Sequence, residues 1–299
     1  MIPTKLKKAA CPVCQNPEAT FFVRKNDCNL FRCQKCSLIF VHPILDKYRD
    51  IYQSTYLEGK NELQHAGDAE AWEATTGTFQ SYLEKIEKFQ PGKGKLFDVG
   101  SATGLFIEMA AKRGWDASGI EISKGAAETG RRKGLNIDQG NFEIWSGETG
   151  FDAVTFWDVL EHFLRPDLAV QNARIILRKG GLLAINAPDS RSILLKILGK
   201  RWHHLNPPSH LHYFNLGNLK NLLKKNDFEI VYSGRIGKKF TLRQIFKLLA
   251  MWQGLSLWKA TYSFLSRNRL GELKIPINTR DNFFVLARKI GSEERHSKI

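Results

Sequence analysis

The chain has 299 residues, of which 42% are hydrophobic and 25% charged, and its formal net charge at pH 7 is +15. This balance is typical of a globular protein. The longest apolar stretch, residues 248–258, is too short for the roughly 18–20 residues of a membrane-spanning helix. The N-terminus shows no apolar core of a secretory signal, so we expect a cytoplasmic chain with reduced thiols.

The positive charge is concentrated in the C-terminal third. Residues 191–280 hold 17 Lys and Arg against 3 Asp and Glu. Such a field attracts phosphate-bearing partners, namely nucleic acid, anionic lipid or a nucleotide-linked substrate. The alternative is a solvated basic surface without a partner.

All five cysteines lie before residue 37, and four of them form two C-x-x-C pairs separated by 18 residues. This spacing predicts a tetrahedral four-thiolate zinc site, with redox-active or disulfide-bonded cysteines as the alternative. The segment between the pairs can form a hairpin, as in a zinc ribbon. We expect a small N-terminal zinc ribbon over residues 1–45 with a structural zinc bound by Cys11, Cys14, Cys33 and Cys36, and assign no role to Cys28.

A helical linker is expected over residues 46–92, with helical character at 66–89 and a Pro-Gly break after it. From residue 95 the pattern alternates between short apolar runs and amphipathic segments. This rhythm predicts a doubly wound, mostly parallel α/β sheet in a domain over residues 93–290. The expected strands are 95–100, 115–122, 135–141, 151–158 and 180–188, and the expected helices are 103–113, 123–133 and 166–178.

Polar residues close four successive strands: Asp98, Glu121, Asn141 and Asp158. Ligands of such sheets bind at the carboxyl ends of the strands. The loop GSATG at 100–104 lacks the second glycine of a dinucleotide motif, and the carboxylate before it would repel pyrophosphate. Glu121 suits a ribose diol. A cofactor with an ammonium group, a ribose and no phosphate is S-adenosylmethionine, and another nucleotide is the alternative.

The stretches LFDVGSATGLFIEMAAKRGW (96–115), ASGIEIS (117–123), GNFE (140–143) and FDAVTFWDVLEHFLRP (151–166) resemble class I S-adenosylmethionine-dependent methyltransferases. They are most similar to the branch of ubiquinone-biosynthesis O-methyltransferases, often fused to a zinc ribbon. The resemblance implies a Rossmann-like sheet of seven strands. It also implies cofactor contacts by Asp98, Gly100, Ser101, Ala102, Gly104, Glu121, Ile122, Asn141, Phe142 and Asp158.

Histidines supply the candidates for a general base. His162 follows the fourth strand, where a structural hydrogen bond is the alternative role. The resemblance also implies that Asp158, Glu161 and His162 hold a divalent ion. Residues 201–214 carry four histidines and two prolines, which suggests a substrate lid with His210 and His212 as base candidates or as packing residues. The spacing of these histidines is not diagnostic of a metal site.

The last two strands are expected at 228–234 and 282–289, the second antiparallel, with a basic apolar insertion between them at 235–281 and a frayed tail at 291–299. Within the insertion, residues 238–270 carry apolar side chains at helical spacing. They fit an interfacial membrane helix, a cap over the active site, or a partner contact.

The expected function is transfer of a methyl group to a small molecule, a sugar or a lipid-linked acceptor, with O-methylation favoured. An RNA methyltransferase that uses the ribbon and the basic face is one alternative. A non-catalytic cofactor-binding scaffold is another. The expected location is the cytoplasm, with peripheral membrane contact through residues 238–270, and the sequence does not fix the oligomeric state.

Overall fold

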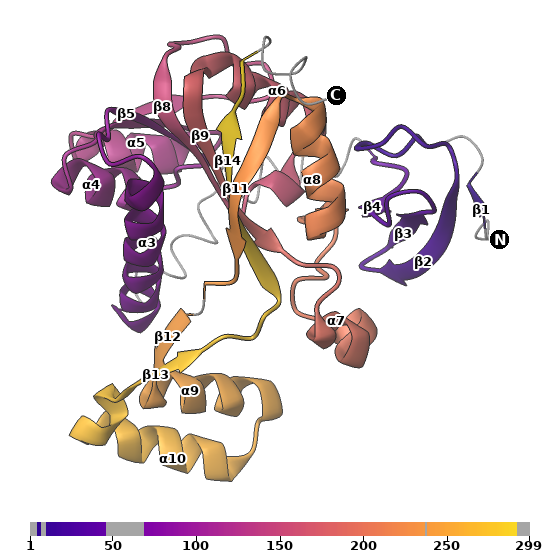
Figure 1. The fold of residues 1–299 in the computed structure, drawn as a ribbon. Helices are drawn as coiled ribbons and strands as arrows, with labels where there is room; N and C mark the ends of the chain where they lie inside the picture. Colours follow the sequence, from indigo (N-terminus) through magenta and orange to yellow (C-terminus); the bar gives the residue numbers. More distant parts are fainter. Residues whose placement is uncertain (1–4, 7–9, 46–68, 237, 292–299) are drawn as a thin grey trace.

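The computed structural model of the chain describes residues 5–6, 10–45, 69–236 and 238–291. A seven-stranded sheet with the order β11-β14-β9-β8-β5-β6-β7 forms its centre (Figure 1). All neighbouring strands pair in parallel except β14, which is antiparallel to both β9 and β11. The predicted mostly parallel, doubly wound sheet with an antiparallel last strand is confirmed. Its strands are β5 (Lys95–Val99), β6 (Asp116–Glu121), β7 (Asn136–Gln139), β8 (Phe151–Trp157), β9 (Leu177–Pro188), β11 (Phe228–Gly234) and β14 (Asn282–Lys289).

Helices cover both faces of this sheet because successive strand residues point to opposite sides. In β5, Leu96 belongs to one apolar cluster, with α3 (Ala69–Phe89) and α4 (Leu105–Lys112). The next residue, Phe97, belongs to another cluster, with α6 (Pro166–Ile176) and α8 (Leu216–Lys225). The predicted helices at 103–113, 123–133 and 166–178 correspond to α4, α5 (Lys124–Arg132) and α6. Residues 46–68 of the expected linker lie outside the described residues, as do 292–299 of the expected tail.

A second, antiparallel sheet contains the N-terminal cysteines. Its order is β1 (Lys5–Leu6), β2 (Ala19–Lys25), β3 (Cys28–Cys33), β4 (Ile39–Val41) and β10 (His212–Tyr213). The predicted hairpin between the two cysteine pairs is confirmed as β2–β3. It turns at Asn26 and Asp27, whose φ angles of 48° and 59° match the two left-handed residues of a tight hairpin turn.

The cysteine-containing region is packed onto the large domain. Strand β10 comes from the histidine-rich segment and pairs with β4, His212 opposite Phe40. Lys225 of α8 donates to the Val13 carbonyl at 2.9 Å. Apolar side chains of both regions form one continuous cluster. The segment expected as a lid therefore ends in a strand that ties the two regions together.

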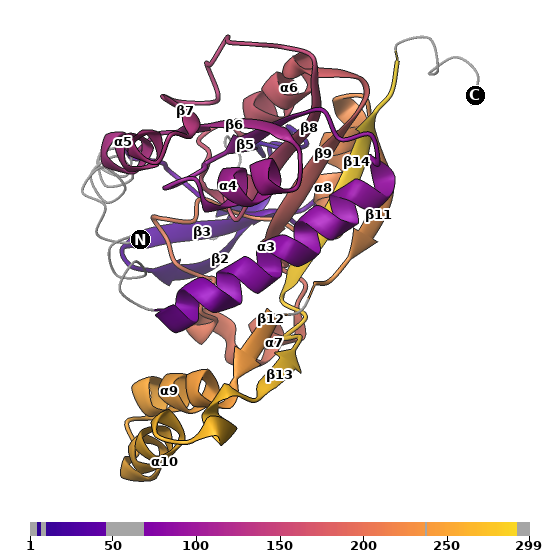
Figure 2. The same ribbon diagram turned by 90° about the vertical axis from the view of Figure 1, so that its left-hand side faces the viewer.

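The insertion forms a separate projection between β11 and β14. A two-stranded ladder, β12 (Lys238–Thr241) and β13 (Lys274–Ile277), leads into α9 (Leu242–Gln253) and α10 (Ser256–Ser266). The two helices stand away from the central sheet in both views (Figures 1 and 2). They follow the end of β11, so they lie beyond the sheet edge at which the parallel strands end. None of the helices in the described part of the chain combines the length and the hydrophobicity of a membrane-spanning segment.

Candidate functional site

The loop after β5 needs its two predicted glycines. Gly100 and Gly104 have φ angles of 73° and 85°, the left-handed region that glycine adopts without steric cost. A Cβ at Gly104 would lie 2.3 Å from Leu135 Cδ1, and one at Gly100 would lie 2.8 Å from Val159 Cγ2. Ala102, between these glycines, also has a positive φ of 54°. The backbone of this loop is thus turned sharply at the sheet edge.

Glu121 closes β6 beside this loop. Its Oε2 accepts from the Ala102 N–H at 2.9 Å and its Oε1 from the Ser123 N–H at 2.8 Å. Only 2% of the residue is exposed, and burial raises the pKa of its carboxyl. Each carboxylate oxygen has about two acceptor positions, so both oxygens retain capacity for a second donor. A ribose diol offers two such donors.

Asp98 lies deeper, near the end of β5. It is 2% exposed, and its Oδ1 accepts from the Thr155 hydroxyl at 2.6 Å. Burial raises the pKa of this carboxyl to about 8, and the charge of Glu121 adds to the increase. Asp98 and Glu121 are therefore two buried acids at the ends of neighbouring strands. None of their hydrogen-bond partners in the described residues is a basic side chain. A cationic ligand group would stabilise the charged form of Asp98.

The residues after β7 agree only in part with the expected adenine site. Ile122 and Asn141 are partly exposed, and the Asn141 side chain bonds its own loop, with Oδ1 accepting from the Glu143 N–H at 2.9 Å. Phe142 differs from the expectation. It is 2% exposed, and its ring packs against those of Phe97 and Phe156, with centroids 6.1 and 5.7 Å away. Phe142 is a core residue in this structure.

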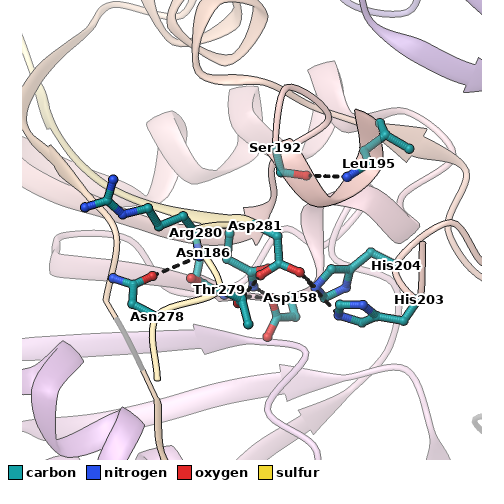
Figure 3. A network of polar contacts seen from close by, with 11 residues as sticks. Asp158, Asn186, Ser192, Leu195, His203, His204, Asn278, Thr279, Arg280 and Asp281 are labelled. Carbon is teal, nitrogen blue, oxygen red and sulfur yellow. Dashed lines mark hydrogen bonds and ion pairs between the residues drawn. The ribbon is translucent and has the colours of Figure 1, made fainter. Parts of the chain in front are cut away.

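Asp158 is the exposed acid of the site and follows β8 directly. Its φ of 50° lies in the left-handed region, which marks a sharp turn at the end of the strand. Its Oδ1 accepts from Asn186 Nδ2 at 2.7 Å and from Asn282 Nδ2 at 3.3 Å. These two amides come from β9 and β14 and were not identified from the sequence. Figure 3 shows Asp158 beside Asn186 and the segment that precedes β14.

A buried polar cluster follows Asp158. Ligand atoms of Glu161, His162 and His210 all lie within 4.8 Å of one another. Neither carboxylate oxygen of Glu161 has a hydrogen-bond partner, and burial together with Asp158 raises the pKa of Glu161. This set differs from the one that the resemblance implies, because His210 takes the place of Asp158. Its orphaned oxygens fit a bound cation.

The His162 ring contacts two backbone segments. Its Nδ1 lies 2.7 Å from the Ser209 carbonyl oxygen, which can only accept and so favours a proton on Nδ1, and the backbone of Asp158 also contacts the ring. Burial lowers the pKa of His162 to about 4, so the ring is neutral near pH 7. The His210 ring stands perpendicular to it at 4.7 Å, and burial also lowers the pKa of His210.

His212, the third base candidate, is placed differently. It belongs to β10, is 1% exposed and packs against the Phe214 ring at 6.2 Å. Burial lowers its pKa to about 4. The residue contributes to the joint between the two sheets, which agrees with the packing role rather than with that of a general base.

The four predicted zinc ligands converge. Cys11 Sγ lies 3.5 Å from Cys36 Sγ, and Cys14 Sγ lies 3.5 Å from Cys33 Sγ. All four sulfurs fall within 4.8 Å of one another. Zn–S bonds of about 2.3 Å in a tetrahedron place the sulfurs about 3.8 Å apart. The arrangement therefore fits a zinc ion bound by four thiolates. Cys28 is not part of this set, and its thiol donates to the Asn26 carbonyl.

Comparison with known proteins assigns this chain to a family of methyltransferases. The sequence model of the family described as "Methyltransferase domain" matches residues 71–233. The chain is 32% identical over 118 residues to a ubiquinone biosynthesis O-methyltransferase of Alkalilimnicola ehrlichii, covering 36% of this chain and 48% of that protein. It is 26% identical over 187 residues to the protein of the same name from Histophilus somni, covering 50% and 79%. The chain spans about half the length of most of the curated relatives it matches.

Solved structures agree on the fold. Magnesium protoporphyrin IX methyltransferase from Synechocystis superposes with a TM-score of 0.54 at 14% identity, covering 82% of this chain and 99% of that one. The 1,6-didemethyltoxoflavin-N1-methyltransferase of Burkholderia thailandensis, with bound S-adenosylhomocysteine, has a TM-score of 0.52 at 13% identity, covering 91% and 99%. At these identities the likeness concerns the fold alone.

Proposed function

We propose that this chain, which belongs to the methyltransferase-domain family, is an S-adenosylmethionine-dependent enzyme that methylates an oxygen atom of a small-molecule acceptor. The observation that carries the proposal is the state of His162. The ring is neutral, its Nδ1 faces the Ser209 carbonyl, and it contacts the backbone of Asp158, so we assign Nε2 as the nitrogen that takes up the acceptor's proton. A positioned base of this kind suits a hydroxyl acceptor. The names of the relatives with 26–32% identity support the same reaction class.

We assign the cofactor-binding roles as follows. Glu121 binds the ribose hydroxyls through the second acceptor position of each oxygen. Asp98 and Asp158 provide negative charge for the ammonium and the methionine portion. Ile122 and Asn141 border the adenine, and the loop from Gly100 through Ser101 and Ala102 to Gly104 allows close approach of the backbone.

The chemistry asked of the protein is alignment and proton removal. S-adenosylmethionine supplies a methyl group that is already activated by the sulfonium. The acceptor oxygen attacks this carbon in line as the carbon–sulfur bond breaks, and the hydroxyl proton passes to His162 Nε2. The His210 ring lies beside this ring, at a centroid distance of 4.7 Å. Should a divalent cation bind at Glu161, His162 and His210, it would occupy the same ring nitrogen of His162 and would activate the acceptor oxygen electrostatically in place of that base.

We propose a structural role for zinc at the four cysteines. Four thiolates would fill all four coordination positions of a zinc ion, which leaves none for a substrate. The region between β1 and β4 is small, so a metal would contribute directly to its folding. Because β4 pairs with β10, that stability would extend to the segment that carries His210.

The projecting insertion is our candidate for contact with a membrane surface or a lipid-linked acceptor. Five large apolar residues in and around α10 are between 52% and 64% exposed: Leu255, Leu257, Phe264, Leu270 and Leu273. Residues 235–281 also contain ten Lys and Arg against two acids. Apolar side chains next to basic ones suit an anionic lipid interface. Flotation with anionic vesicles should carry the wild type, and Leu257→Asp with Phe264→Asp should remove this binding.

The experiment for the main proposal is transfer of labelled methyl from S-adenosylmethionine into a lysate of the native host, separated into RNA, protein, lipid and small-molecule fractions. We expect label in the small-molecule or lipid fraction. Label in RNA would overturn the acceptor class and reassign the basic face to nucleic acid. The comparisons support neither the RNA acceptor nor the non-catalytic scaffold.

A further inference from the structure

A third cluster of possible metal ligands lies just before β14, apart from the cysteines and from the cluster of Glu161, His162 and His210. His203 Nε2 is 3.4 Å and His204 Nε2 is 3.6 Å from the same oxygen, Asp281 Oδ2. The three ligand atoms all fall within 4.8 Å of one another. Figure 3 shows both imidazoles on the same side of the carboxylate. From this geometry we propose that His203, His204 and Asp281 form a binding site for a divalent transition-metal ion of the zinc class.

The distances favour an ion over a simple hydrogen bond. A hydrogen bond between a ring N–H and an oxygen spans about 2.7–3.2 Å, and both separations exceed this range. Metal–ligand bonds of about 2.0–2.2 Å at tetrahedral angles place neighbouring ligand atoms about 3.3–3.6 Å apart. The two histidine–carboxylate separations agree with that spacing. Two imidazoles and one carboxylate are also the donor set that zinc, iron, cobalt and nickel favour over magnesium.

The carboxylate is held ready to act as a ligand. Asp281 is 3% exposed, and its Oδ1 accepts from the Thr279 hydroxyl, while Oδ2 has no hydrogen-bond donor. Its backbone carbonyl accepts from the Asp189 N–H at 2.7 Å. A partner on one oxygen fixes the orientation of the other, as the outer shell of a metal site does. A buried anionic oxygen without a donor is costly, and an ion would remove that cost.

The histidines are held by the turn on which they lie. Trp202 and Leu205 flank the pair and are both fully buried, and the Leu205 N–H donates to the Trp202 carbonyl at 3.0 Å. The His203 side chain is 46% and the His204 side chain 21% exposed. An ion therefore has a route from solvent, and three protein ligands leave a fourth position for an outside molecule.

The cluster is near the proposed acceptor side. Asn282, the residue after Asp281, donates to Asp158 at 3.3 Å, and the His204 ring lies 6.3 Å from that of His210. An ion at this place could bind an acceptor oxygen and lower its pKa. This role rests on the proposed function, whereas metal binding itself does not.

The test is titration of the metal-stripped full chain with Co²⁺, with visible spectra and metal analysis. Thiolate-to-cobalt charge transfer reports on the cysteine site, and nitrogen and oxygen ligands give only weak ligand-field bands, so the two sites are read separately. We expect Asp281→Asn and His203→Ala to lose about one equivalent without change in the thiolate band. Thr279→Ala should weaken this equivalent by about 10–100-fold. Asp116→Asn, an exposed carboxylate at the opposite edge of the sheet, is the control.

Binding of S-adenosylhomocysteine by calorimetry verifies that each variant is folded. Cobalt bound at the thiolates alone in the wild type would overturn the proposal. So would a further equivalent that persists in Asp281→Asn, for example one lost only in Glu161→Gln. Either result would leave the methyltransferase assignment intact, because acceptor methylation is measured separately.

Discussion

Replacement of Glu121 by Gln tests the cofactor site most specifically. The carboxylate accepts one backbone N–H on each oxygen, at 2.9 and 2.8 Å, and we assign the remaining positions to two ribose hydroxyls. Gln keeps the shape but puts an NH2 group in place of one oxygen, so one of the two backbone N–H groups loses its acceptor as well. One ribose hydroxyl then loses a charged acceptor, which is worth about 1.5–3 kcal/mol. At 1.4 kcal/mol per decade, we expect the Kd for S-adenosylhomocysteine to rise by roughly 10–150-fold.

Calorimetry with S-adenosylhomocysteine and its 2′-deoxyribose analogue separates this contact from a general loss of structure. The wild type should bind the analogue more weakly than S-adenosylhomocysteine, whereas Glu121→Gln should bind the two ligands with nearly equal Kd. Glu128→Gln makes the same chemical change on α5, where the side chain is 48% exposed, and should bind like the wild type. A Kd for Glu121→Gln within about 3-fold of the wild type, or an equal penalty for the analogue in both proteins, would refute the assignment.

Three further predictions concern the base, the buried acid and the zinc. His162→Gln should lower kcat by about 100–10,000-fold and leave the Kd for cofactor unchanged, as measured by steady-state kinetics and calorimetry; an unaltered kcat would exclude His162 as the base. The pKa of Asp98, raised to about 8, means that the free protein holds this carboxyl protonated near neutrality, whereas the cofactor ammonium favours the carboxylate. Cofactor affinity should therefore increase about tenfold per pH unit between about pH 5.5 and 7. Asp98→Asn should abolish that slope, and a wild type without it would contradict the reasoning. A chelator should lower the Tm of the wild type and of Cys28→Ser. Cys11→Ser should already have a lower Tm, which the chelator should leave unchanged. A wild-type Tm that is the same with and without chelator would argue against structural zinc.

The acids at the carboxyl ends of the parallel strands could be predicted from the sequence for a physical reason. Buried parallel strands are continuous apolar runs, and an acid such as Glu121 or Asp158 that ends such a run must lie where the run meets solvent or ligand. The cysteine pairs were equally informative, because a short C-x-x-C turn presents two sulfurs to one point. Both signals are local in sequence.

The parts that sequence reasoning missed depend on long-range packing. Strand β10 has two residues and exists because β4 pairs with it, which no local pattern reports. Phe142 follows Asn141 at the sheet edge, but adjacency does not say to which side a ring turns, and the aromatic residues beneath the loop draw it into the core. Asp281 ends a long insertion, so only the tertiary fold brings it to His203 and His204. Its sole local signal was an acid immediately before the last strand.

The most direct test of the central claim is to identify the methylated atom. The protein is incubated with ¹³C-methyl S-adenosylmethionine and a host extract, and the labelled product is isolated and its methyl carbon assigned by NMR. We predict a methyl group bonded to oxygen, in a small molecule or lipid, whose formation depends on His162. A labelled methyl on nitrogen or carbon, or in RNA, would contradict the account.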